Sequence, residues 1–372
     1  MRSSFALVLA MALAADDLHS AFEAVKGAQA EVAAADAAKD LARFKAARAS
    51  LPPLQARFKE LFAAADWNAL DPVKDRELLG GGLLTAGRDA LERGDGKTAV
   101  RAFEMVLSKL GKEPFAPAVG VRHLPAAYVL AGEASKAVAR WDACAADPDP
   151  GVAALANLLL GDLRCALGDL AAAKTAWKKA ADAKVTDPAK DPAAGPKADA
   201  VLRLALVGNP APEIESNSWF GGEKSTLSRQ KGKVVVLEFF STGNPTSREG
   251  LAGLDGLFAA ERARGLVVLG VTHYYPHGFL PRRGTREPAT DGEPVRDIPE
   301  DDYPAHLKRF RENLGVAFPL VLAEQPAYDA YGVKAIPFRA VLDRDGTVAW
   351  FRVGTGDEAL FRGVVKRLLD RK

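Results

Sequence analysis

Cysteine is nearly absent from this sequence, whose 372 residues include only Cys144 and Cys165. The helical pattern around them predicts two consecutive antiparallel helices joined by a loop near residues 147–151. At about 1.5 Å per residue, the two thiols would lie roughly 13 Å apart along the helix axes. Because a disulfide needs Cα atoms within about 7 Å of each other, we expect no disulfide between them.

An excess of charge of one sign is absent as well. The 50 basic and 48 acidic residues are interspersed along the chain, and the formal net charge is +2. This balance gives no reason to expect nucleic acid or a bilayer surface as a partner. A membrane-spanning helix needs about 20 mostly apolar residues, and we expect no such span in the mature chain.

The first 15 residues have the pattern of an export signal. Arg2 provides a positive start, residues 5–13 are a short apolar core, and Ala12-Leu13-Ala14 has the small-x-small form of a cleavage site. The alternative is a frayed first helix, but helix-forming sequence begins directly afterwards, at Asp16. We therefore predict a signal peptide at residues 1–15 and a mature protein in the periplasm or outside the cell.

Residues 16–185 are rich in alanine and carry apolar residues at three- and four-residue spacing, which predicts helices. The spacing Gly-x4-Ala-x3-aromatic occurs three times: Gly94, Ala99 and Phe103; Gly132, Ala137 and Trp141; Gly168, Ala173 and Trp177. Small residues let two antiparallel helices approach closely, and the aromatic ring fills the gap against the next helix. The alternative is a generic helical bundle.

This pattern resembles a tetratricopeptide array, whose period is about 34 residues, over approximately residues 75–183. The resemblance implies a stack of helix pairs with a concave surface that binds peptides or proteins. A spacer or dimerisation element without a free groove is the alternative use of such a stack. Residues 186–207 are expected to be a proline- and aspartate-rich linker with a short helix.

From residue 208 the pattern changes to short β-rich runs that alternate with helices, which is typical of an α/β domain. Strands are expected at residues 234–240, 266–272, 338–343 and 348–353. Helices are expected at residues 245–264, 304–313 and 357–370. The tight turn at Asp343-Arg344-Asp345-Gly346 predicts that the last two strands form a hairpin.

This half contains a set of short segments that together match a known family: Pro212-Glu213-Ile214, Trp219, Lys231-Gly232-Lys233, Phe239-Phe240-Ser241-Thr242, Arg248-Glu249, residues 331–337 and residues 342–346. In these segments it resembles the TlpA/ResA type of thioredoxin-fold oxidoreductase, within the AhpC/TSA–redoxin superfamily. The resemblance implies a thioredoxin-like fold over residues 208–372. It also implies a cis Ile336–Pro337 bond facing the active-site turn.

The sequence departs from this family at the active site itself. The family's Cys-x-x-Cys falls on Asn244-Pro245-Thr246-Ser247, and the peroxidatic cysteine of peroxiredoxin-type relatives also falls on Asn244. Disulfide exchange needs a thiolate, which neither asparagine nor serine can supply. Asparagine at the N-cap and proline at the first helical position are nevertheless preferred residues. We therefore predict that the turn keeps its capping role and has no catalytic residue.

Other candidate sites are weaker. His273 and His277 lie four apart, but Pro276 prevents a regular helix between them, so loop histidines are expected rather than a metal site. Residues 276–302 form a charged insertion. We expect it to be a mobile loop, and the alternative is a lid or a loop that docks a partner. No nucleophile-elbow motif accompanies the serines of this region, so a hydrolase is not expected.

Together these features predict a two-domain protein, in which a helical tetratricopeptide-like array is joined to a redox-inactive thioredoxin-like domain that binds a protein or an extended peptide. The predicted binding residues are Ser241, Thr242, Gly243, Asn244, Pro245, Thr246, Ser247, Ile336 and Pro337. One alternative is a thiol–disulfide oxidoreductase or peroxiredoxin-like protein. Another is a structural array that the thioredoxin-like part only caps. No cofactor or metal is expected, and the oligomeric state stays open.

Overall fold

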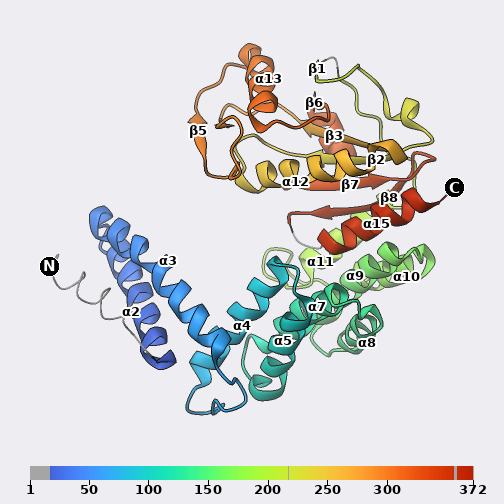
Figure 1. The fold of residues 1–372 in the computed structure, drawn as a ribbon. Helices are drawn as coiled ribbons and strands as arrows, with labels where there is room; N and C mark the ends of the chain where they lie inside the picture. The colour runs from blue at the N-terminus through green and yellow to red at the C-terminus, as the bar shows by residue number, and fades with distance from the viewer. Residues whose placement is uncertain (1–16, 217, 356–357, 372) are drawn as a thin grey trace. The chain divides into compact units, whose positions relative to one another are not determined.

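The computed structural model describes residues 17–216, 218–355 and 358–371 (Figure 1). The predicted signal peptide at residues 1–15 lies outside these ranges. The chain divides into two compact units, an N-terminal unit that ends at Cys144 and a C-terminal unit that begins at Ala145.

The N-terminal unit is helical, as its alanine-rich periodicity predicts. Asp17, Asp40 and Asp95 each cap the helix that follows by accepting a hydrogen bond from a first-turn backbone N–H group. The helices are α2 (Leu18–Ala37), α3 (Leu41–Ala64), α4 (Arg76–Glu92), α5 (Gly96–Leu110), α6 (Ala116–Ala118), a π-helical turn at Val119–His123, α7 (Leu124–Leu130) and α8 (Ala134–Cys144).

The C-terminal unit begins with the helices α9 (Pro150–Leu167), α10 (Leu170–Ala181) and α11 (Ala194–Leu206). The strands are β1 (Ser218–Phe220), β2 (Val234–Phe239), β3 (Leu266–Thr272), β4 (Gly278–Pro281), β5 (Gly292–Val295), β6 (Leu320–Leu322), β7 (Phe338–Leu342) and β8 (Val348–Val353). The helices between and after them are α12 (Pro245–Glu261), α13 (Tyr303–Leu314), α14 (Gln325–Ala330) and α15 (Glu358–Asp370). Short 3-10 turns lie at Leu227–Gln230, Arg262–Arg264 and Glu300–Asp302.

The repeated Gly-x4-Ala-x3-aromatic pattern packs as its spacing suggests. The three leading glycines, Gly94, Gly132 and Gly168, have left-handed φ angles of 78°, 80° and 95°. Each lies where one helix ends and the next begins, a position that favours glycine. The three alanines and three aromatic residues that follow are buried. The sequence therefore identified genuine helix-packing positions.

Glycines on the preceding helices make room for two of these aromatic rings. A Cβ atom added to Gly87 would lie 2.5 Å from the ring of Phe103, within the N-terminal unit. A Cβ atom added to Gly161 would lie 2.3 Å from the ring of Trp177, within the C-terminal unit. Both distances are shorter than any van der Waals contact, so the ring fills a notch that only glycine leaves open.

A six-stranded mixed sheet in the order β1-β6-β3-β2-β7-β8 forms the core of the C-terminal unit. β2, β3 and β6 run parallel, whereas β1, β7 and β8 pair antiparallel with their neighbours. Every residue of β2 is buried, which explains why all of them but Glu238 are apolar. Glu238 lies on the face covered by α12 and α15, and the next residue, Phe239, packs against Tyr328 of α14 on the other face. This is a thioredoxin-like α/β fold.

Helices α9, α10 and α11 belong with this sheet, so the division of the chain falls earlier than the expected end of the helical domain at residue 185. Residues 186–207 were expected to be a linker with a short helix; that helix is present as α11, and it packs against both α9 and α10. The backbone of Gly208 and Asn209 exchanges hydrogen bonds with Val348 of β8. The helical periodicity was recognised correctly, but periodicity does not reveal which surface a helix covers.

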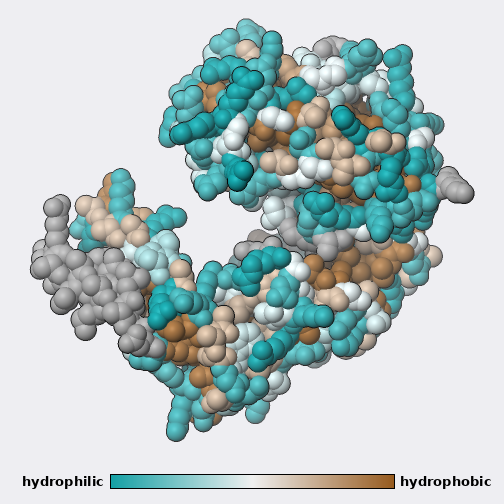
Figure 2. Space-filling view, viewed as in Figure 1, coloured by the Kyte–Doolittle hydropathy of each residue, from teal (hydrophilic) through white to brown (hydrophobic). Residues whose placement is uncertain are grey.

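Helix α9 is long and apolar enough to cross a membrane by length and composition, and 56% of this segment is buried inside the protein. It contacts α10, α11, α15 and β8, which accounts for its hydropathy. Figure 2 shows that apolar side chains also reach the surface over this group of helices. Leu167 of α9 and Val201 of α11 are 56% and 52% exposed.

A buried ion pair fastens these helices to the sheet. The guanidinium of Arg203 on α11 donates two hydrogen bonds to the carboxylate of Asp162 on α9, at 2.5 and 2.8 Å. The indole of Trp177 on α10 donates to the same carboxylate at 3.0 Å. The guanidinium also lies 4.9 Å from the ring centroid of Phe351 on β8. One carboxylate thus joins three helices and, through Arg203, the sheet.

We expect Asp162→Asn to lower the free energy of unfolding by about 3–5 kcal/mol, because it leaves the Arg203 charge buried without its partner. Asp182→Asn removes the same charge from an exposed i,i+4 pair with Lys178 and serves as the control, with an expected loss below about 0.5 kcal/mol. Chemical denaturation monitored by tryptophan fluorescence measures both. Equal losses in the two variants would contradict a structural role for the buried pair.

Candidate functional site

The turn between β2 and α12 is built as a helix cap. Asn244 is the N-cap of α12, and its Oδ1 atom accepts hydrogen bonds from the Ser247 backbone N–H at 2.9 Å and the Thr246 hydroxyl at 2.6 Å. Pro245 occupies the first helical position, where its missing N–H group costs nothing. The predicted capping role of Asn244 and Pro245 is therefore confirmed.

The side chains of the turn differ in how accessible they are. Ser241, Thr242 and Ser247 are buried, with exposed fractions of 6%, 0% and 0%. Gly243 and Pro245 are exposed, and Asn244 and Thr246 are half-buried. The Ser247 Oγ atom has no hydrogen-bond partner among the described residues. Ser247 stands where the resemblance places the second cysteine, so this position is inaccessible to a protein substrate.

Neither cysteine supplies the missing thiol within its own unit. Cys165 is buried, its Sγ atom lies 3.2 Å from the Ala349 carbonyl at the start of β8, and burial raises its pKa to about 12. β8 starts at the opposite end of the sheet from the turn, about four residues or roughly 13 Å along the strands. Cys144 is buried in the N-terminal unit, and the two thiols form no disulfide.

The second part of the predicted groove lies beside the turn. The Ile336–Pro337 bond is cis, as the resemblance implied. Phe239 at the end of β2 pairs with Phe338 at the start of β7, which brings the Ile336–Pro337 segment next to the start of the turn. Ala335 is exposed and Ile336 is half-buried. Among the described residues, the peptide groups of Ala335 and Ile336 form no backbone hydrogen bond.

A buried hydrogen bond supports the turn from below. The Thr242 hydroxyl lies 2.9 Å from Nε2 of His306 on α13. A Cβ atom added to Gly278 would lie 2.6 Å from both of these atoms, so glycine is required there. Burial lowers the pKa of His306 to about 4 and keeps the imidazole neutral near pH 7. His306 could not be identified from sequence, because a lone histidine in a helix does not reveal its burial.

The insertion at residues 276–302 is an ordered β-hairpin, β4–β5, rather than the mobile loop that was the default expectation. Arg248 on α12, 2% exposed, ties it to the turn. Its guanidinium donates to the Thr242 carbonyl at 2.8 Å, to the Pro288 carbonyl at 2.7 Å and to the Ala289 carbonyl. It also lies 3.9 Å from the ring centroid of Phe279 on β4. The insertion is therefore a fixed wall beside the turn.

The two loop histidines serve packing in this structure. The His273 ring lies 4.2 Å from that of Tyr275 and 4.5 Å from that of Tyr328, and burial lowers its pKa. Nδ1 of His277 lies 3.4 Å from the backbone N–H of Asp297. Within the part of the chain that the structure describes, no three His, Cys, Asp or Glu side chains come together as metal ligands.

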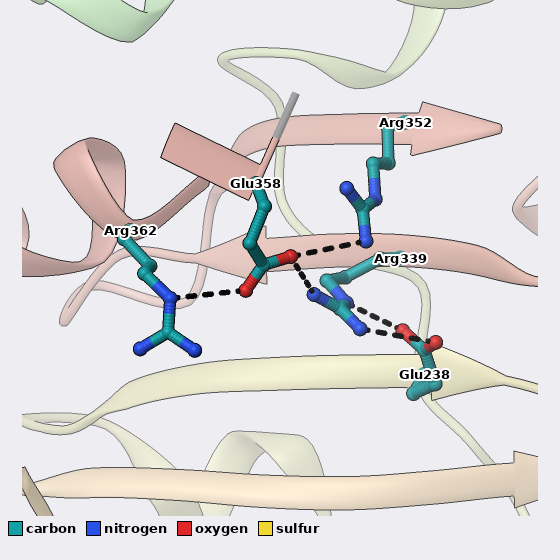
Figure 3. Close-up of polar contacts among 5 residues, drawn as sticks. All are labelled: Glu238, Arg339, Arg352, Glu358 and Arg362. Atoms are coloured by element: carbon teal, nitrogen blue, oxygen red, sulfur yellow. Dashed lines mark hydrogen bonds and ion pairs between the residues drawn. The ribbon is translucent and has the colours of Figure 1, made fainter. Parts of the chain in front are cut away.

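A charge network runs from the buried pair Glu238–Arg339 in the sheet to the exposed Glu358 and Arg362 on α15 (Figure 3). Glu238 of β2 and Arg339 of β7, 1% and 2% exposed, form an ion pair at 2.6 Å. Glu358 of α15 extends it by contacting Arg339 at 3.3 Å, Arg352 at 3.4 Å and Arg362 at 3.2 Å. A side chain at Gly250 would lie 2.9 Å from Glu238, so the glycine on α12 leaves space for the carboxylate.

The topology of the sheet, the turn at the end of its central strand and the cis proline beside that turn agree with a match to a family model. Residues 207–351 match the model of the AhpC/TSA family. This match does not distinguish the finer resemblance to the TlpA/ResA type.

Several known proteins are similar to this chain over less than half of its length. DipZ of Mycobacterium tuberculosis and DipZ of Mycobacterium bovis are each 23% identical over 177 residues, which is 46% of this chain and 22% of DipZ. A thiol:disulfide interchange protein from Chlorobium tepidum is 21% identical, with a TM-score of 0.32, over 43% of this chain and 96% of that one. A thiol-disulfide isomerase from Corynebacterium glutamicum is 19% identical, with a TM-score of 0.33, over 44% and 98%.

The neutral state of His306 makes the stability of the AhpC/TSA domain depend on pH. The pKa of His306 is about 4 in the folded state, against about 6.5 when unfolded, so the unfolded chain binds the extra proton between these values. We expect the free energy of unfolding to fall by up to about 3 kcal/mol as the pH drops from 6.5 to 4. His306→Gln should lack this contribution. If the free energy of unfolding falls equally with pH in the native protein and in His306→Gln, then His306 is not the source of the pH dependence.

The Arg248 contacts predict how firmly the insertion is held. Arg248→Met keeps the length of the side chain but loses the three donated hydrogen bonds, and Arg248→Lys keeps the charge without the guanidinium geometry. We expect trypsin to cleave both variants after Arg282, Arg283 or Arg286 about ten-fold faster than the native protein, as expected for easier local opening. Unchanged cleavage kinetics in both variants would show that other contacts hold the hairpin.

Proposed function

We propose that this protein binds an extended peptide segment of a partner protein without redox chemistry. The observation that carries the proposal is a turn that retains its N-cap but has no thiol, beside backbone groups of Ala335 and Ile336 that have no partner among the described residues. Unpaired extended backbone can add a peptide strand through main-chain hydrogen bonds. Of the residues expected to bind, Gly243, Asn244, Pro245, Thr246 and Ile336 are open to a peptide, whereas Ser241, Thr242, Ser247 and Pro337 are buried and support this surface from below.

The insertion shapes this groove. Arg248 holds the β4–β5 hairpin beside Thr242, and a Cβ atom on Gly243 would lie 3.4 Å from the His277 carbonyl. We therefore expect the peptide to approach from the side of Ala335 and Ile336, where Ala335 is exposed. A groove with one fixed wall needs little reorganisation on binding, which favours affinity.

The helical part completes the proposal. We infer that its repeated glycine–alanine–aromatic packing is a tetratricopeptide-like array that holds a second part of the same partner. The export pattern of residues 1–15 supports a location in the periplasm or outside the cell, where we propose a scaffold or assembly role. No cofactor is needed for such a role.

A thiol–disulfide oxidoreductase is the second candidate, favoured by the AhpC/TSA match over residues 207–351 and by relatives that are named as disulfide interchange proteins. Against it stand Asn244 and Ser247 in place of the two cysteines, and the pKa of Cys165, raised to about 12. A thiol with that pKa is almost wholly protonated near pH 7 and is a poor nucleophile.

Peptide binding is tested by placing a charge in the groove. We expect Ile336→Glu to abolish recovery of partner proteins from an envelope fraction, because the half-buried side chain lies beside the unpaired backbone. Val201→Glu introduces the same charge at an exposed apolar position of α11 in the same unit and serves as the control. Identical prey recovered by native protein, variant and control would place binding elsewhere.

Restoring the thiols tests what the turn has lost. We expect the native protein to show no insulin reduction, and Asn244→Cys/Ser247→Cys to gain it, since a helix N-terminus lowers the pKa of a thiol placed there. Asn244→Cys alone is the matched control, because it lacks the resolving thiol. Turnover by the native protein that survives alkylation of Cys144 and Cys165 would overturn the redox-inactive proposal.

A further inference from the structure

Two aromatic side chains lie across the β2–α12 turn from Ala335 and Ile336. The strand order is β3-β2-β7, so the end of β3 and the start of β7 flank the turn, about 10 Å apart. His273 and Tyr275 follow directly after β3. Both are half-buried, and their ring centroids are 4.2 Å apart. These two residues are called the aromatic rim below.

The contacts of the neighbouring residues show that the aromatic rim lies beside the turn. The ring of Tyr328 on α14 lies 4.5 Å from that of His273, and its hydroxyl lies 3.5 Å from the carbonyl oxygen of Phe240, the residue that precedes the turn. Further along, a Cβ atom added to Gly243 would lie 3.4 Å from the His277 carbonyl oxygen. Residues 273–277 therefore follow the turn from its start to its middle.

Buried rings join the aromatic rim to the cis-proline segment. The ring of Tyr328 lies 5.1 Å from that of Phe239, and Phe239 lies 5.6 Å from Phe338, which directly follows Pro337. Phe239 and Phe338 are 0% exposed, and Tyr328 is 3% exposed. Closely packed side chains deform little. This floor therefore holds the rim and Ile336 at a fixed spacing.

The chemistry around the groove favours an uncharged side chain. Residues 241–247, 273–277 and 335–337 include no Asp, Glu, Lys or Arg. Burial lowers the pKa of His273, so its ring is neutral near pH 7. Exposed Lys334 precedes Ala335, and the positive end of the α12 dipole lies at the turn. An aromatic face attracts cations, but these two positive groups oppose a cationic ligand here.

The spacing also fits an aromatic side chain. An extended peptide lies about 5 Å from the strand with which it pairs, which leaves about 5 Å between a peptide at Ile336 and the aromatic rim. A phenyl or phenol ring spans that distance. Contact between aromatic rings contributes about 0.5–1.5 kcal/mol beyond the burial of apolar area.

We propose that the aromatic rim determines the specificity of the groove by binding an aromatic side chain of the partner's extended segment, in preference to lysine or arginine. The main chain of that segment pairs with Ala335 and Ile336, and the selected side chain crosses the turn to His273 and Tyr275. This inference rests on the proposed peptide binding and names the residue type that the groove prefers.

Isothermal titration calorimetry of the full chain with three peptides, acetyl-Thr-Ala-Thr-X-Thr-Ala-Thr-amide with phenylalanine, alanine or lysine at X, tests the proposal. We expect the native protein to bind the phenylalanine peptide at least about five-fold more tightly than the alanine peptide, and the lysine peptide no more tightly than alanine. Tyr275→Ala should reduce the five-fold preference to below about two-fold. A preference is a ratio within one protein, so partial unfolding of the variant leaves it unchanged.

Phe258→Ala is the matched control. It removes another half-buried ring of the same unit, one that packs against Phe318 roughly 20 Å along α12 from the turn. This variant should keep the full preference for phenylalanine. Loss of the preference in Phe258→Ala as well as in Tyr275→Ala would contradict a specific role for the rim.

The remaining outcomes separate this proposal from peptide binding itself. Equal affinity for the phenylalanine and alanine peptides, with binding that Ile336→Glu abolishes, would overturn the role of the rim and leave the groove intact. Tighter binding of the lysine peptide would overturn it too. Peptide binding that Ile336→Glu leaves unchanged would overturn the groove and the rim together. If none of the peptides binds at millimolar concentration, the rim proposal is wrong, and recovery of partner proteins still tests the groove.

Discussion

Backbone N–H groups at the start of a buried helix must find acceptors, and at the start of α12 Asn244 provides one. Because α12 leaves the end of the central strand β2, this cap fixes the angle at which the helix crosses the sheet. Arg248 extends outward from the first turn of the same helix to the insertion, and Thr242 just before it reaches His306. The cap needs an amide oxygen and no thiol, so Asn244 can hold the turn without a cysteine.

The long elements could be predicted from sequence because burial imposes a pattern on them. β2, β3, β7 and β8 were located to within one residue at each end, and α12, α13 and α15 to within three. β1, β6 and α14 were missed because they contain only three to six residues, too few for a period to appear. Their positions depend on pairing with distant strands, as in the contact between Trp219 and Val321.

The candidate site was predictable only in part, for a related reason. Asn244-Pro245 carries a local signal, since capping involves neighbouring residues. Arg248, His306 and the Glu238–Arg339 pair carry none, because their burial results from contacts between residues 40 to 101 positions apart. The same limit explains the domain boundary. The sequence of α9 shows an apolar helix, but only the structure shows that Asp162 and Arg203 join it to its neighbours and the sheet.

The pairing of residues 208–211 with β8 has a consequence for solubility. At this edge of the sheet, the backbone groups of Gly346 and Val348 would otherwise lack partners. They form hydrogen bonds with the backbone of Gly208, Asn209 and Ala211. The opposite border is β1, which is only three residues long. Exposed strand borders are templates on which further chains polymerise. By shortening both borders, the fold lowers the risk that copies of the protein stack into fibrils at high concentration.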